Sequence, residues 1–262
     1  KSESESIVIH HKHWKNGVIF QRFFGKDPIR GAEPIPDDIK YDSRLQRTRL
    51  GEFYLCIPMP LEIRADNQGP VHARIEDGII ALDPGVRTFM TGYSTEGEAL
   101  EWGKDDFKRV YRLCLSLDKL QSKWSQKEVK HRKRYKMKRA GRRIRKKIRD
   151  LTDDAQRKLV KLLVENYRLI LLPTFETQKM SRRSSRKISG KTVRSMLTWG
   201  HYRFKQRLLS KVREYPWCHV IIVDEHFTSK TCGNCGDLHS RLGSSKTFKC
   251  PSCSVEMDRD IN

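Results

Sequence analysis

Short apolar runs separated by polar residues predict strands in the first part of the chain. The runs Ser6–His10, Gly17–Phe20 and Gly51–Pro58 alternate with proline-rich and charged segments. This pattern is typical of a small β-rich module. A stronger apolar run begins at Gly78 and ends in Asp83-Pro84-Gly85, after which a second run continues to Tyr93. It predicts a β-hairpin with a carboxylate at its rim, although Asp-Pro-Gly is also a common turn in which the Asp serves only as a cap.

Between residues 105 and 167 the apolar positions recur three and four residues apart, which is the period of a helix. Two such stripes predict a helical hairpin: Val110, Leu113, Leu117, Leu120 and Trp124; then Ile144, Ile148, Leu151, Ala155, Leu159 and Leu162. After it we expect a buried strand at 168–173 that continues towards residue 180, a mobile basic loop at 181–191, an amphipathic helix at 193–212, and a strand at 220–223.

The charge of the chain is strongly positive and clustered. Lys and Arg number 54 against 32 Asp and Glu, a formal net charge of +22, which favours contact with phosphates. Residues 127–149 hold fourteen Lys or Arg and one acid, and residues 179–213 hold twelve and none. A solvated helix face usually alternates in sign. We therefore interpret both segments as surfaces for a nucleic-acid backbone, and the first also as a possible nuclear-localisation run.

Four of the seven cysteines have the spacing of a metal site: Cys232-x2-Cys235 and Cys250-x2-Cys253. Two such pairs can present four thiolates to one tetrahedral Zn²⁺, and that set leaves no open position, so the zinc is expected to be structural. Two disulfides are the alternative, but the chain has no secretory features, and the cysteine usage is typical of a reducing compartment. No apolar run approaches the roughly 20 residues of a membrane span, so we expect no membrane partner.

Carboxylates follow several of the apolar runs. Asp83 follows the first, Glu176 or Asp224 and Glu225 follow later strands, and Asp258 and Asp260 follow the zinc pattern. Acids from distant segments that meet at one sheet edge could hold Mg²⁺ for phosphodiester hydrolysis, with two ions expected. Spacing alone does not show that they converge, and solvated surface acids are the default interpretation of each one.

Four motifs together resemble the transposon-encoded Fanzor/TnpB (OrfB-like) family of RNA-guided DNA nucleases, which is related to type V CRISPR effectors. They are LDPGVRTF at 82–89, FETQKM at 175–180, TSKTCGNCG at 228–236, and CPSC with DRDIN at 250–262. The wording of the first two is closer to the Fanzor branch. The resemblance covers roughly residues 50 to 262.

The resemblance implies an α/β fold: an RNase H-like RuvC nuclease domain with a helical insertion and an inserted zinc ribbon, preceded by a small β-rich, wedge-like module. The expected division is a wedge-like remnant at 1–76, a first RuvC segment at 77–104, a basic helical hairpin at 105–168, a second RuvC segment at 169–227, the zinc ribbon at 228–256 and a last RuvC segment at 257–262. We expect the chain to be an internal piece of a longer protein.

The resemblance also implies site residues. Asp83 matches the first RuvC aspartate and Asp260 the last, both as catalytic magnesium ligands. The strand that usually ends in the middle acid ends here in Pro173. Glu225 is then the expected middle ligand, because a strand end is a stiffer mount than a loop, with Glu176 as the alternative.

The function expected from these features is that of a Mg²⁺-dependent, RNA-guided DNA endonuclease with guide RNA and target DNA as partners. Its location is expected to be nuclear, and the sequence does not indicate an oligomeric state. Two alternatives stay open: a catalytically inactive homologue that binds RNA and DNA, and an RNase H-like transposase that joins DNA ends without RNA.

Overall fold

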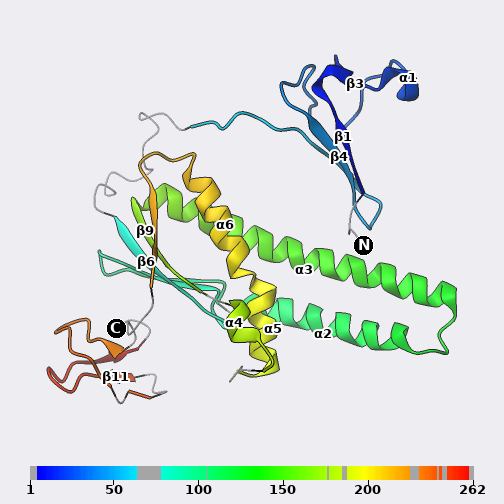
Figure 1. Cartoon of the computed structure of the whole chain (residues 1–262). Coiled ribbons are helices and arrows are strands. Elements are labelled where there is room, and N and C mark those ends of the chain that lie inside the picture. The colour runs from blue at the N-terminus through cyan, green and yellow to red at the C-terminus, as the bar shows by residue number, and fades with distance from the viewer. Residues whose placement is uncertain are drawn as a thin grey trace. The chain divides into compact units, whose positions relative to one another are not determined.

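The structure is a computed structural model that describes residues 5–63, 78–104, 106–175, 177–184, 188–224, 230–240, 242–243 and 247–259. The chain forms two compact units. The first combines residues 1–62 with 113–147, and the second combines residues 63–112 with 148–262. Figure 1 shows the elements of both units. Among the described residues, no helix has both the length and the hydrophobicity of a membrane span.

The N-terminal part of the first unit is built on short antiparallel strands. β1 (Glu5–Ile9), β4 (Ser43–Arg47) and β5 (Phe53–Cys56) form a three-stranded sheet in the order β1-β4-β5, and β2 (Trp14–Lys15) pairs with β3 (Val18–Ile19). η1 (His11–His13) and α1 (Gln21–Phe24) are single turns. Ile9, Trp14 and Ile19 form the buried core. The Trp14 indole N–H donates to the carbonyls of Pro36 and Asp37, which fixes the intervening loop against this core.

Two long helices follow as a hairpin: α2 (Asp106–Ser125) and α3 (His131–Asn166) (Figure 1). Close packing near their junction requires Gly141, because a Cβ there would lie 2.6 Å from the Trp124 ring. The guanidinium of Arg134 donates to the carbonyls of Trp124, Gln126 and Lys127. It thereby satisfies backbone groups that the end of α2 leaves without helical partners.

The second unit contains a five-stranded sheet in the order β10-β9-β6-β7-β8. β6 (Ile79–Pro84), β7 (Met90–Ser94) and β8 (Ala99–Trp102) form an antiparallel meander. β9 (Leu169–Pro173) pairs parallel to β6, and β10 (His219–Val223) pairs parallel to β9. The strands β6, β9 and β10 therefore end at the same edge of the sheet.

Helices cover one face of this sheet. In β6 and β9, Ile80, Leu82, Ile170 and Leu172 are buried, while the residues between them are more exposed. Their cluster includes Leu159, Leu163 and Val164 from α3, Trp199 from α5 (Gly190–Trp199), and Phe204 and Leu208 from α6 (His201–Val212). This alternation is expected of strands with one covered face.

Several details differ from the predictions, and the strand β4 is one that the sequence analysis did not predict. The helix expected at 193–212 is two helices, because Gly200 adopts φ +65° and ends α5, whereupon α6 begins. The strand expected to continue towards residue 180 is replaced by the short helix α4 (Thr177–Ser181). β8 was not predicted, since its four residues alternate too briefly to stand out. The α/β class is confirmed.

Candidate functional site

Asp83 lies in β6 at the edge where the parallel strands end. Its neighbours Leu82 and Pro84 are buried while Asp83 itself is exposed, so its side chain is on the face opposite the helices. Asp83 pairs with Thr91 on the antiparallel neighbour strand β7. The strand therefore gives this carboxylate a fixed mount and access to solvent, which a metal ligand requires.

The turn after Asp83 is held from the helix side. The Val86 carbonyl accepts hydrogen bonds from the Ser195 hydroxyl at 2.9 Å and from the Trp199 indole at 3.3 Å, both on α5. A Cβ on Gly85 would lie 2.4 Å from the Thr88 carbonyl oxygen, so the turn accepts only glycine there. Sequence reasoning missed Ser195 and Trp199, because nothing in the sequence links α5 to a turn more than 100 residues earlier.

The register of the sheet brings other strand ends level with Asp83. β6 pairs Ala81 with Leu171, and β9 pairs Pro173 with Val223. Continued by two residues, the β6–β9 register places Asp83 level with Pro173 and therefore with Val223. β9 provides no acid at this level. Of the other predicted acids, Glu225, Asp260 and the alternative Glu176 lie outside the described residues, so their roles stay predictions.

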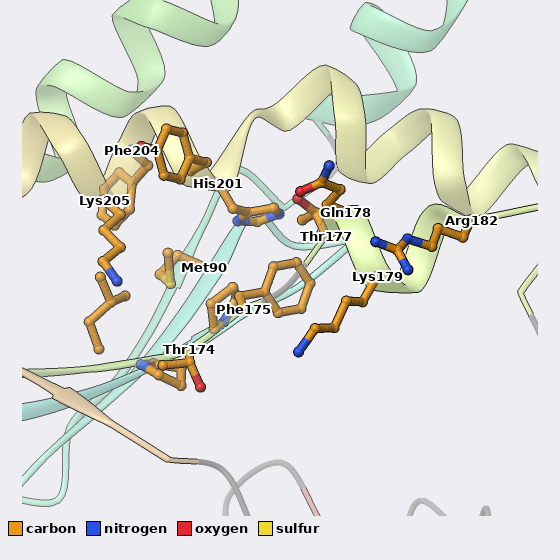
Figure 2. A pocket seen from close by; sticks show the side chains of 14 residues that line it. Met90, Thr174, Phe175, Thr177, Gln178, Lys179, Arg182, His201, Phe204 and Lys205 are labelled. Carbon is orange, nitrogen blue, oxygen red and sulfur yellow. The ribbon is translucent and has the colours of Figure 1, made fainter. Parts of the chain in front are cut away.

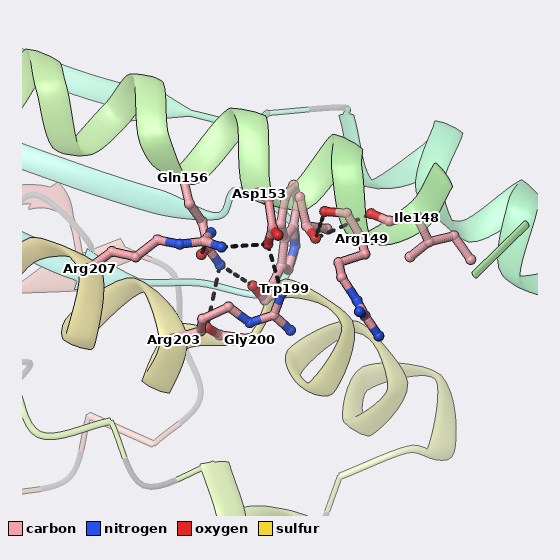
Figure 3. A network of polar contacts seen from close by, with 9 residues as sticks. Ile148, Arg149, Asp153, Gln156, Trp199, Gly200, Arg203 and Arg207 are labelled. Atoms are coloured by element: carbon pink, nitrogen blue, oxygen red, sulfur yellow. Dashed lines mark hydrogen bonds and ion pairs between the residues drawn. The ribbon is translucent and has the colours of Figure 1, made fainter. Parts of the chain in front are cut away.

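A buried polar network fixes the break between α5 and α6 (Figure 3). The Gln156 amide on α3 donates to the carbonyls of Trp199 and Gly200 at 2.5 and 3.4 Å. Its oxygen accepts from Arg207 at 2.6 Å. Arg207 and Arg203 both pair with the carboxylate of Asp153, at 2.9 and 2.7 Å. Two cations of the second basic segment thus have a carboxylate partner on α3, Arg207 half-buried and Arg203 still exposed, and the use of the segment as a phosphate surface stays a prediction.

His201 begins α6 and is only 4% exposed. Its ring stacks on Phe89 with centroids 5.0 Å apart and meets Phe175 edge-on at 4.7 Å. Neither ring nitrogen has a hydrogen-bond partner among the described residues. Burial lowers the pKa of His201 to about 4, while a polar contact between its ring and the Gly85 backbone acts in the opposite direction. The ring is therefore neutral near pH 7.

Because the pKa of His201 is lowered, we expect the stability of the protein to depend on pH. This pKa is lower in the folded state than its ordinary 6.5, so the unfolded chain binds the extra proton first as the pH falls. The stability that the neutral His201 contributes to the folded state is fully present above pH 6.5. It is lost as the pH falls towards 4, by about 3 kcal/mol in total. Between pH 7 and 4.5 the melting temperature of the wild type should fall more than that of His201→Phe. An equal fall in melting temperature for the wild type and His201→Phe would contradict this prediction.

The four cysteines predicted from their spacing come together. The Sγ atoms of Cys232, Cys235, Cys250 and Cys253 all lie within 4.8 Å of one another. The pairs Cys232–Cys253 and Cys235–Cys250 are 3.6 and 3.5 Å apart. A disulfide needs about 2.05 Å, and all four are free thiols. Tetrahedral Zn²⁺ with Zn–S bonds of about 2.3 Å sets its sulfurs roughly 3.8 Å apart, so the donor set fits this metal.

Two similar knuckles present these thiols. Gly236 N–H donates to the Cys232 carbonyl, and Ser254 N–H donates to the Cys250 carbonyl. Gly236 and Ser254 each follow the second cysteine of a pair, with φ of 74° and 58°. The second knuckle joins β11 (Thr247–Lys249) to β12 (Glu256–Asp258), which pair antiparallel. The apolar support is small: Leu242, Phe248, Val255 and Met257.

Part of the first basic segment also has structural partners within its own unit. Lys146 pairs with Glu52 at 2.7 Å, which lowers the pKa of the Glu52 carboxyl and raises that of Lys146. Arg142 donates to the Arg49 carbonyl, and Arg134 caps α2 as described above. Most of the other cations between 127 and 149 are exposed along the first half of α3, where they can contact phosphates.

Two family models match the chain. The OrfB_IS605 model, described as "Probable transposase", matches residues 63–189. The model described as "Cas12f1-like, TNB domain" matches residues 201–262. The first model therefore includes Asp83, and the second includes the four cysteines.

Individual proteins are also similar to this chain in sequence. A "Putative transposase" of Paramecium bursaria Chlorella virus 1 is 32% identical over 99% of this chain and 57% of its own length. A "TnpB-like protein" of Acanthamoeba polyphaga mimivirus is 28% identical over 98% of this chain and 48% of its own. The chain thus spans about half the length of these relatives. The structure titled "Cryo-EM structure of the Cas12f1-sgRNA-target DNA complex" matches 82% of this chain and 43% of its own, with 17% identity and a TM-score of 0.51, which shows a shared fold.

Proposed function

Because this chain belongs to the TnpB (OrfB-like) family, we propose that the protein is an RNA-guided DNA endonuclease that hydrolyses phosphodiester bonds at a single RuvC-type site. The observation that carries the proposal is Asp83, an exposed carboxylate at the edge where β6, β9 and β10 end. In open α/β sheets, ligands bind outside the carboxyl ends of parallel strands.

In this proposal Asp83 holds a divalent cation together with Glu225 and Asp260. Glu225 follows the last residue of β10 by two positions, and Asp260 follows the last residue of β12 by two. Magnesium bound by these carboxylates would supply an activated water and stabilise the leaving oxygen. The hydrogen bonds from Ser195 and Trp199 to Val86 hold the turn beside Asp83, so that the carboxylate keeps its position as substrate arrives.

The partners proposed are a guide RNA and a target DNA. The solved relative with the same fold is titled as a complex with both. The exposed cations of α3 are the surface proposed to track their backbones, since a channel of this kind recognises phosphates while base pairing provides the sequence specificity. We propose that the zinc site braces the segment between β10 and β12 and takes no part in the chemistry, because four thiolates leave no position for water.

A catalytically inactive homologue that binds RNA and DNA is the second candidate. When the β6–β9 register is continued by two residues, Pro173 at the end of β9 is level with Asp83, so the strand next to Asp83 offers no carboxylate there. Such a protein would retain its basic surfaces and its zinc site but would not cut.

The test is to purify the full-length protein with its RNA and to sequence that RNA. A single structured species with a variable end is expected, and reprogramming that end should redirect the cutting of a plasmid in the presence of Mg²⁺. Binding at the programmed site without cutting would favour the inactive homologue. Joining of DNA ends after the RNA has been digested would favour a transposase, and a mixture of unrelated RNAs would refute guidance.

A further inference from the structure

A cavity of about 500 Å³ opens beside the strand end that carries Asp83, on the helix side of the sheet (Figure 2). Its apolar base is formed by Pro84, Met90, Leu172 and Phe204. These residues belong to β6, β7, β9 and α6, all in the second unit. The volume is within the roughly 300–1,000 Å³ of ligand-sized pockets. The activity proposed above does not use this cavity.

One wall of the cavity combines an aromatic ring with a buried polar group. Phe175 is half-buried and lines the cavity next to His201, as Figure 2 shows. Neither nitrogen of His201 makes a hydrogen bond of good geometry to the described residues, and the Gly85 backbone is a polar contact of the ring. A buried polar group without a partner is costly and uncommon in folded proteins. A ligand that hydrogen-bonds this ring would remove that cost.

The rim of the cavity is positively charged. Lys179, Arg182 and Lys205 line it, and no acid is among its described lining residues. Lys179 and Arg182 are exposed, and both lie at α4 or just after it, whereas Lys205 comes from α6. An anionic group that enters from solvent therefore meets cations from two sides. Together with the aromatic wall, this favours a ligand with a flat ring at one end and a phosphate at the other.

We propose that this cavity binds one unpaired nucleotide of a nucleic-acid strand, with its base against Phe175 and His201, the phosphate on one side at Lys179 and Arg182, and the phosphate on the other side at Lys205. The proposal rests on the proposed function, since it takes the strand to be the one that passes Asp83. Pro84 lines the cavity and directly follows Asp83 in β6. A nucleotide bound here would hold its strand beside that carboxylate.

The protonation state of His201 agrees with this ligand. A neutral imidazole has one N–H donor and one acceptor nitrogen, and the edge of a base also presents donors and acceptors. Stacking on an aromatic side chain is tolerant of base identity, because every base has a π face. The cavity is therefore expected to accept all four bases with modest preferences.

Binding to short oligonucleotides tests the proposal without any cutting. The full chain is titrated with an eight-residue oligodeoxyadenylate and with an abasic strand of the same length, without added divalent cations. The wild type should bind the strand with bases about 5- to 100-fold more tightly. Phe175→Leu should reduce that ratio to near one, and His201→Phe, which keeps a ring but removes the nitrogens, should reduce it in part. An unchanged ratio in a folded Phe175→Leu protein would overturn the proposal.

Matched changes at the rim separate the cavity from the general basic surface. Arg182 lines the cavity, whereas its neighbour Arg183 is also exposed but does not. Arg182→Glu is expected to weaken binding of the oligonucleotide at least about 10-fold, and Arg183→Glu less than about 3-fold, because only Arg182 is placed to contact the bound phosphate. Equal effects would overturn the proposal even if Phe175→Leu failed to fold.

A free nucleotide is the other source of the same chemistry. Adenosine monophosphate is titrated in parallel. Binding that depends on Phe175, combined with no difference between the two oligonucleotides, would assign the cavity to a soluble nucleotide and overturn the strand assignment. Because none of these measurements requires cleavage, their failure would leave the endonuclease proposal untouched, and a loss of cleavage would not affect them.

Discussion

Asp83→Asn is expected to abolish magnesium-dependent DNA cleavage while the protein still folds and binds nucleic acid. The change removes the negative charge and leaves the shape of the side chain almost unaltered. If Asp83 is a metal ligand, its loss removes several kcal/mol of transition-state stabilisation, which corresponds to a fall of about 10³-fold or more in rate. Single-turnover cleavage of a guided target, alongside binding to the same target, measures both properties.

The sheet itself offers a matched control. Glu101 on β8 pairs with Thr91 on β7, and Thr91 pairs with Asp83 on β6, so the two acids stand at the same level of the sheet. Glu101 is also exposed, and its ion pair is with Lys104. Glu101→Gln should leave the cleavage rate within about twofold of the wild type, since a surface ion pair contributes roughly 1 kcal/mol or less. A comparable loss in both variants would show that Asp83 has no special role, and joint loss of nucleic-acid binding would contradict the assignment.

Cys235→Ser is expected to cost the protein its zinc and to unfold the segment around residues 230–259. The apolar cluster there is small, and folded pieces of about 40 residues or fewer usually need a metal or disulfides. Structural zinc supplies about 10–16 kcal/mol of apparent binding free energy in zinc-finger peptides. The wild type should contain about one equivalent of zinc by elemental analysis, and the variant well below that.

Cys56 provides the control for that experiment, because it is exposed and belongs to the first unit. Cys56→Ser should keep the full zinc content. Proteolysis in Cys235→Ser should begin within residues 230–259 while the five-stranded sheet persists, since its core includes no residue of the zinc segment. Full zinc retention by Cys235→Ser, or wild-type resistance to proteolysis without zinc, would show that the metal does not hold this segment.

The sequence predicted those parts of the fold that depend on local pattern. The apolar runs at 79–84, 169–173 and 219–223 are strands, and the two helical stripes form α2 and α3. The cysteine spacing alone predicted the cluster of four thiols, because each Cys-x-x-Cys pair forms its own knuckle. Local pattern was therefore sufficient for these elements, although it did not reveal the short strand β8.

Features that depend on distant contacts could not be predicted. Gly200 ends α5 in a left-handed conformation. The side chain of Gln156, which lies on α3, donates to the Trp199 and Gly200 carbonyls at that break. The basic runs indicated phosphates, yet Arg134 and Arg207 have structural partners that only the fold reveals. Of the three carboxylates predicted as metal ligands, only Asp83 is among the described residues, so the site stays a prediction.

The parallel pairing of β6 with β9 also has a consequence for how the chain folds. Ile79 pairs with Leu169, about 90 residues later, whereas the β6–β7–β8 meander and the α2–α3 hairpin involve near neighbours in the sequence. Loops of this length make pairing slow. On a ribosome that adds about 5–20 residues per second, β6 waits roughly 5–20 s for its partner. Its apolar edge is open throughout that time, and an open edge is a template for aggregation. Chains that stall or end inside α3 are therefore expected to be the species most prone to aggregate.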